Sequence, residues 1–268
     1  MTRRGVWFGK FIFIDPRLFC NTSIKIIYLQ YKIRYFNTMC FSLEMSTVML
    51  VLGSITTFVA ARNINPKAAM LVGYFTIMQA IHILGYLTIN DCDNTLNQIA
   101  SYTNYAHVCF QPFFFLIGLY GLMEFCNYND KKSVSRIQYA LKLSFMIGVL
   151  LFIRMFNLLD KTQTRANGSC VWCGKVCSFK GEKHINFSLP LTYPHYLTPS
   201  LFLHTFGMFV IPLFINKFTA FSTLILFLTT YIPSVVHGIK GSEAGTIWCF
   251  TSILQCIVIF MLALFWKK

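Results

Sequence analysis

Long apolar runs separated by short polar connections dominate the chain. A helix that crosses the hydrocarbon core of a bilayer needs on the order of 20 residues. The runs are continuous, which excludes the two-residue alternation of a transmembrane barrel. We therefore predict an all-α polytopic membrane protein, a bundle of seven transmembrane helices. The predicted helices cover residues 45–61, 68–89, 105–125, 139–159, 200–215, 218–236 and 246–266.

Composition favours the lipid bilayer as the main partner. The sequence is 56% hydrophobic and 12% charged, whereas a soluble domain has roughly 25% charged residues. So few charges cannot cover a globule with polar surface. The net charge of +14 comes from Lys and Arg scattered between the apolar runs. Because no basic stripe is interleaved with aromatic residues, we expect no nucleic-acid partner.

The basic residues between the runs predict an orientation. More Lys and Arg lie after the first, third and fifth runs and in the tail than in the other connections. Cytoplasmic connections carry the excess of Lys and Arg, so we expect a cytoplasmic carboxyl terminus. The residues on the predicted cytoplasmic side are Arg62, Lys67, Lys131, Lys132, Arg136, Lys142, Lys217, Lys267 and Lys268.

Residues 1–38 disagree with this orientation, because they add seven basic residues and one acid, Asp15, to the outer side. Charges interrupt them too often for a signal peptide or a membrane span. One interpretation is a basic amphipathic arm on the membrane surface. We favour the other, in which the native protein begins at Met39 and the seven-helix domain covers residues 39–268, because this restores the orientation rule.

The longest connection, residues 160–199, lies on the predicted luminal or outer side. Together with the short connection between the second and third runs, it holds four cysteines. In an oxidising compartment an even number predicts two disulfides, with three possible connectivities. Two sequons in the same loop are candidate glycosylation sites. The disulfide candidates are Cys92, Cys170, Cys173 and Cys177, and the glycosylation candidates are Asn167 and Asn186.

The same loop has an alternative interpretation as a zinc site. Cys170, Cys173, Cys177 and His184 offer three sulfurs and one nitrogen, a ligand set that structural zinc favours. However, the spacing matches no standard zinc finger, and thiols outside the cytosol oxidise before they bind metal. We therefore predict disulfides and no cofactor, and keep zinc as the alternative.

Polar residues at membrane depth are costly and so mark candidate functional positions. Two of them lie three residues apart on one face of the second run, and two lie four apart in the third run. If these faces meet, they form a polar pocket that opens toward the luminal side. The alternative is that the side chains only hydrogen-bond between helices. The pocket candidates are Gln79, His82, His107, Gln111, His204 and Glu243.

These features lead to three hypotheses about function. The first is a membrane protein that binds or senses a small molecule or lipid in this pocket, capped by the cysteine loop. The second is a metal-dependent intramembrane lipid hydrolase, which would use His82, His107, His204 and Glu243. The third is a transporter, although the chain shows no inverted repeat. The sequence indicates neither the ligand nor the oligomeric state.

Several segments together match a family pattern. They are "MCFS" (39–42), "GYFTIMQAIHILGY" (73–86), "HVCFQPFF" (107–114), "WCGKVCSFKGEKH" (172–184) and "EAGTIWCFTSI" (243–253). With these motifs the chain resembles a family of seven-helix integral membrane proteins of unknown function, found in bacteria and large DNA viruses. Its members open with M-C-W-S, so the resemblance implies a start at Met39. It also implies a viral gene and a host cell membrane, but no reaction.

The chain departs from the family pattern in the second predicted helix. Family members read closer to L-M-E-A-L-Q there. Gln79 therefore stands where a carboxylate is common, and His82 stands where a glutamine is common. If that carboxylate is catalytic in relatives, this chain lacks the charge on which the activity would depend.

Overall fold

The computed structural model describes seven stretches of the unit that spans Phe41–Lys268. They are residues 42–156, 174–181, 184–191, 202–228, 252–254, 256–257 and 260–261. Five features predicted from sequence lie outside the described residues: the extension 1–38, Asn167, Cys170, Cys173 and Glu243.

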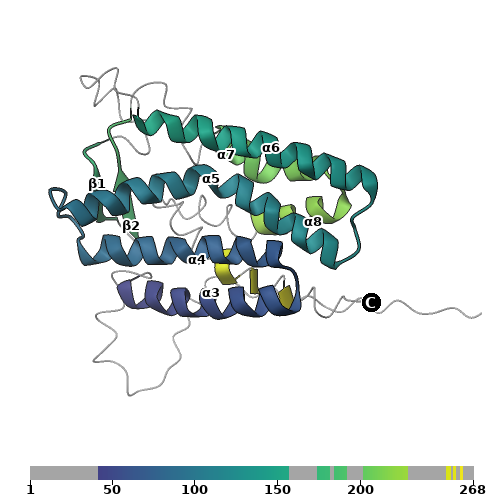
Figure 1. Ribbon diagram of the computed structural model, residues 1–268. Helices are drawn as coiled ribbons and strands as arrows, with labels where there is room; N and C mark the ends of the chain where they lie inside the picture. The colour runs from purple at the N-terminus through teal and green to yellow at the C-terminus, as the bar shows by residue number, and fades with distance from the viewer. Residues whose placement is uncertain are drawn as a thin grey trace, which may run out of the picture. The chain divides into compact units, whose positions relative to one another are not determined.

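Four long antiparallel helices pack in chain order, each against the next (Figure 1). They are α3 (Leu43–Asn63), α4 (Pro66–Leu87), α5 (Thr95–Phe125) and α6 (Lys131–Ile153). A side-chain oxygen caps the amino end of each helix by accepting a backbone N–H that the first turn leaves unpaired. The capping residues are Ser42, Asn65, Asn94 and Asp130. α5 and α6 begin well before the predicted starts at residues 105 and 139.

Within the described part of the chain, these four helices are long and apolar enough to cross a membrane. α3 buries one narrow face against α4 and exposes large apolar side chains, such as Ile55 and Phe58, over the rest. α6 likewise exposes Met146 and Leu150. Such outward surfaces are stable against lipid rather than water. The predicted association with a bilayer is therefore supported.

The second half of the described chain is helical but irregular. The predicted helix 200–215 is a succession of α7 (Phe202–Thr205), the π-helical turn η3 (Phe206–Val210) and the 3-10 turn η4 (Ile211–Phe214). These turns pack against α5 and α6, and α8 (Lys217–Leu226) follows. Of the predicted helix 246–266, the structure describes residues 252–254, 256–257 and 260–261, all of which are helical. The described residues therefore do not test the prediction that the bundle has seven transmembrane helices.

A short two-stranded antiparallel hairpin, which the all-α prediction did not include, is added to this mostly helical fold. β1 (Cys177–Lys180) pairs with β2 (Ile185–Ser188), with Cys177 opposite Ser188 and Lys180 opposite Ile185. β2 alternates buried Ile185 and Phe187 with half-buried Asn186 and Ser188, the two-residue period of a strand with one covered face. The hairpin packs on α4 and α5 at the end where α4 finishes and α5 begins (Figure 1).

Candidate functional site

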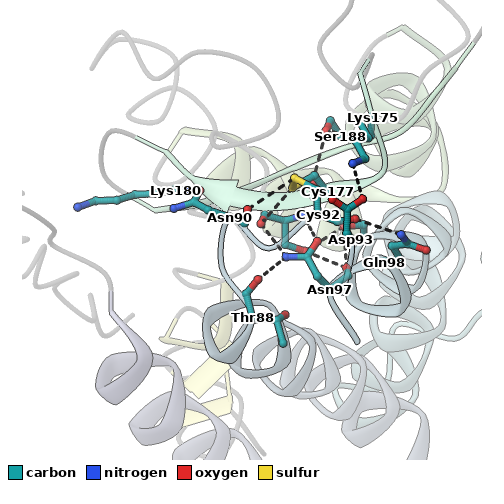
Figure 2. The surroundings of a disulfide bond; sticks show 12 residues. Thr88, Asn90, Cys92, Asp93, Asn97, Gln98, Lys175, Cys177, Lys180 and Ser188 are labelled. Atoms are coloured by element: carbon teal, nitrogen blue, oxygen red, sulfur yellow. Dashed lines mark hydrogen bonds and ion pairs between the residues drawn. A yellow bond between two sulfur atoms is a disulfide. The ribbon is translucent and has the colours of Figure 1, made fainter. Parts of the chain in front are cut away.

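A disulfide ties the hairpin to the connection between α4 and α5. Cys92 in that connection bonds to Cys177 at the start of β1, 85 residues further along the chain, and their Cα atoms lie 4.7 Å apart (Figure 2). This pairing is one of those that the sequence left open. A sulfur in a disulfide is no thiolate ligand, so the zinc set predicted from the loop loses Cys177.

Asn97 in the first turns of α5 holds β1 with both ends of its amide. Its Oδ1 accepts the backbone N–H of Ser178 at 2.7 Å, and its Nδ2 donates to the Ser178 carbonyl at 2.9 Å. The same Nδ2 donates to the carbonyl of Thr88 at 2.6 Å, at the end of α4 (Figure 2). One fully buried amide therefore joins α4, α5 and β1.

Two further residues complete this anchor. The backbone N–H of Asn90 donates to the Ser178 carbonyl at 3.0 Å, and the Asn90 Oδ1 accepts the N–H of Lys180 at 2.9 Å. Asn90 has a φ of 65°, a left-handed conformation that Asn adopts more readily than most residues. The hydroxyls of Ser101 and Ser178 lie 2.9 Å apart, both buried. Every polar group of β1 that faces α5 is thus paired within the anchor.

The inner face of the hairpin covers the last turns of α4. The hairpin lies close to Gly85: a Cβ built there would lie 2.6 Å from the Ile185 Cδ1, so a larger residue would require the Ile185 side chain to shift. One turn earlier on α4, the His82 ring packs edge-on against the His184 ring, with their centroids 4.9 Å apart. The centroid of the Phe187 ring lies 6.0 Å from that of His82. His82, His184 and Phe187 are fully buried. The hairpin therefore forms a lid over this part of α4.

His184 is held as a neutral imidazole. Its Nδ1 accepts the backbone N–H of Ile185 at 2.6 Å and lies 3.2 Å from the hydroxyl of Tyr86. Burial lowers the pKa of His184 to about 3. An accepting Nδ1 assigns the ring proton to Nε2, which leaves no lone pair for a metal. Among the described residues, no three His, Cys, Asp or Glu side chains gather as a metal site.

Three of the predicted pocket residues instead join helices. The His107 Nε2 donates to the Tyr74 carbonyl at 2.7 Å, and the Tyr74 hydroxyl donates to the His107 carbonyl. Their rings stack with centroids 4.0 Å apart. On α7, the His204 Nε2 donates to the Gln111 Oε1 at 3.2 Å. These contacts fit the alternative of interhelical hydrogen bonds.

His204 also lies near the proline in α5. Pro112 has no N–H, so the carbonyl four residues earlier, on Val108, loses its partner in the helix. The His204 ring lies close to the backbone of Val108. Gly207, on the next turn, leaves room for the Pro112 ring, because an added Cβ would lie 2.9 Å from it. The polar residues near Pro112 therefore have a structural explanation.

Three buried polar side chains have none of these interhelical contacts. We call them the polar cluster: Gln79, His82 and Asn104. All three are fully buried, and their side-chain nitrogens and oxygens have no hydrogen-bond partner within the described part of the chain. Gln79 and His82 were predicted from sequence. Asn104 was missed, because the apolar run that predicted this helix begins one residue later. When a polar residue lies just outside an apolar run, the sequence does not indicate that its side chain is buried in the folded protein.

Two cross-links bound the stretch of α4 and α5 in which the members of the cluster lie. Tyr74 of α4 bonds to His107 of α5 at one end, and Thr88 bonds to Asn97 at the other. All three members lie between these cross-links. Asn104 continues the α5 face that carries Asn97 and Ser101, since residues seven and three apart share a helical face. Both halves of the cluster therefore belong to the faces beneath the hairpin.

The glycosylation candidate Asn186 lies half-buried on β2, and its Oδ1 accepts the N–H of Phe187 at 3.2 Å. Ser188, which completes its sequon, donates its hydroxyl to the Lys175 carbonyl at 2.5 Å. Glycosylation of Asn186 stays a prediction.

Comparison with known proteins gives one match. The profile described as "Family of unknown function (DUF5765)" matches residues 44–267. The chain belongs to this family. No curated protein and no solved structure matches the chain. The family match covers the four long helices, the hairpin and the polar cluster, but it assigns no activity to them.

Replacing Asn97 with Ala will destabilise the fold far more than replacing its neighbour Gln98. Asn97→Ala leaves the buried backbone N–H of Ser178 unpaired, at roughly 1–3 kcal/mol. It also removes the hydrogen bonds that the Asn97 Nδ2 donates to the carbonyls of Thr88 and Ser178, although the Ser178 carbonyl keeps the N–H of Asn90. Gln98→Ala removes only one half-buried bond to the Cys92 carbonyl. In thermal unfolding of detergent-purified protein, we expect a fall in Tm on the order of 10 °C for Asn97→Ala and little change for Gln98→Ala. Equal losses would contradict the anchor.

Neutral His184 makes the hairpin sensitive to acid. Its pKa in the folded protein, about 3, lies below the ordinary value of 6.5, so the unfolded chain binds the proton first as the pH falls. The stability is fully present above about pH 6.5 and is lost toward pH 3, at roughly 1.4 kcal/mol per pH unit. His184→Asn keeps an acceptor near the Nδ1 position without titrating. Its Tm will fall less steeply than that of wild type over this range; parallel curves would contradict the assignment.

Proposed function

We propose that this chain is a multi-pass membrane protein that binds or senses a small ligand in the polar cluster between α4 and α5, beneath the hairpin. One observation carries the proposal: Gln79, His82 and Asn104 are each fully buried without partners among the described residues, in the stretch of α4 and α5 between the two cross-links. Buried polar side chains are nearly always paired, whether by protein, by water or by a ligand.

The energetic cost of such a cluster supports a ligand. An unpaired buried polar group costs roughly 1–3 kcal/mol by mutational measures, and the cluster holds three such side chains. The same helices pair their other polar side chains carefully, as the Tyr74–His107 and Gln111–His204 contacts show. Other buried atoms without partners, such as the hydroxyls of Ser46 and Ser144, are single atoms, whereas Gln79, His82 and Asn104 each leave both side-chain polar atoms unpaired. Local departures from such pairing are typical of functional sites.

We further propose that the hairpin faces the lumen or exterior and that the carboxyl terminus is cytoplasmic. The disulfide needs an oxidising compartment, and it lies at the hairpin end of the helices. The opposite end, where α3 meets α4 and α5 meets α6, carries Arg62, Lys67, Lys131 and Lys132. The ligand would then reach the cluster from the outer side or from the bilayer.

The hydrolase hypothesis has less support. Of its four proposed metal ligands, His107 and His204 are engaged in different interhelical contacts, and Glu243 lies outside the described residues. Only His82 remains in the cluster. No observation favours the transporter.

Native mass spectrometry of gently extracted protein tests the binding proposal. We expect wild type to retain a bound small molecule, and Gln79→Leu/Asn104→Leu to lose at least about tenfold in occupancy, because two amides contribute roughly 0.5–1.5 kcal/mol per hydrogen bond. Without ligand, the double variant will melt no lower than wild type, since it removes unpaired buried groups.

Ser144→Ala is the matched control, because Ser144 is also buried on α6 without a partner among the described residues. It should keep the bound molecule. Equal occupancy in all three proteins, or none in wild type, would contradict the proposed site.

A further inference from the structure

We infer that the ligand of the polar cluster is an amphipathic lipid whose head group is an uncharged hydroxyl or amide. The inference rests on the proposed function and adds the chemical class of the ligand. It follows from the charges, the hydrogen-bonding groups and the apolar side chains that surround the cluster.

Along the described stretches of α4 and α5 that carry the cluster, no residue bears a charge, and the charge of Arg154 at the end of α6 acts on Tyr105 and Cys109 of α5. α4 has no Asp, Glu, Lys or Arg after Lys67, and α5 has none before Glu124. Lys67 and Glu124 pair with each other at 2.5 Å, at the far end of both helices. On the hairpin, the charged side chain of Lys180 is exposed. Burying a phosphate, carboxylate or ammonium here without an opposite charge would cost several kcal/mol.

The cluster offers both hydrogen-bond donors and hydrogen-bond acceptors. The amides of Gln79 and Asn104 each provide two N–H donors and a carbonyl acceptor, and a neutral His82 provides one of each. A hydroxyl or an amide both donates and accepts, so it can pair with such groups from either side. A carboxylate or phosphate diester only accepts, and would leave the two carbonyl oxygens unpaired.

Apolar side chains surround the polar atoms. Buried Phe75 and Met78 lie four residues before Gln79 and His82, on the same faces of α4, and Phe187 covers His82 from the hairpin. A few polar groups among apolar and aromatic side chains are typical of sites for carbon-rich ligands. The outer face of α4 exposes Ile77, so lipid lies within one helix diameter, on the order of 10 Å. The bilayer is therefore the nearest source of such a ligand.

Thermal unfolding with a lipid panel tests the inference. Delipidated protein in detergent is heated with monooleoylglycerol or ceramide as neutral lipids, phosphatidylglycerol or oleate as charged lipids, and glycerol as a soluble head group. At about a hundredfold excess over Kd, we expect the neutral lipids to raise the Tm of wild type and Ser144→Ala by on the order of 5 °C. Gln79→Leu/Asn104→Leu should show no rise.

Each of the other outcomes would overturn a different part of the inference about the ligand. A rise with charged lipids that the double variant loses would overturn the neutral head group. A comparable rise with glycerol alone would replace the lipid by a water-soluble polyol. A rise in the double variant equal to that of wild type would mean lipid bound around the helices and not in the cluster.

No rise at all would be interpreted with the mass-spectrometric result. A bound molecule of another class would overturn this inference and leave the proposed function standing. The absence of any bound molecule would overturn both.

Discussion

The fold around the site depends on the anchoring of one short strand. Ser178 of β1 is bonded through its backbone N–H and carbonyl by the buried amide of Asn97, and the neighbouring Cys177 is bonded to Cys92. These contacts bring a segment that follows α6 back across α4 and α5. The anchor acts together with the buried side chains of Ile185 and Phe187, because an isolated two-stranded hairpin is marginally stable in water.

Because of the anchor, the interface between α4 and α5 differs between its two ends. Toward the basic end, α4 and α5 meet through small residues: an added Cβ at Gly118 would lie 2.5 Å from the Leu71 side chain. Toward the hairpin end, their facing positions are polar, and the hairpin excludes water from them. Polar side chains covered in this way must find partners or remain costly. Asn97 and Ser101 find them in β1, whereas Gln79, His82 and Asn104 find none among the described residues.

Sequence alone predicted the apolar helices well, because long continuous runs leave little ambiguity. It placed Gln79 and His82 in the site for a sound reason, the cost of polar groups at membrane depth. The same rule gave His107, Gln111 and His204, whose neighbours Tyr74 and Val108 could not be read from spacing. The hairpin and Asn104 were missed for a related cause. Both depend on contacts between segments far apart in the chain, and the strand "INFS" is too short to be distinguished from loop.

The central claim is that a bound molecule completes the hydrogen bonds of the polar cluster. The most direct test is an experimental density map of protein purified with its native lipids, sharp enough to place side-chain amides. The account predicts non-protein density within hydrogen-bonding distance of Gln79, His82 and Asn104, continuing as an apolar body among the neighbouring side chains. A map in which these three side chains hydrogen-bond only to one another or to ordered water would contradict it.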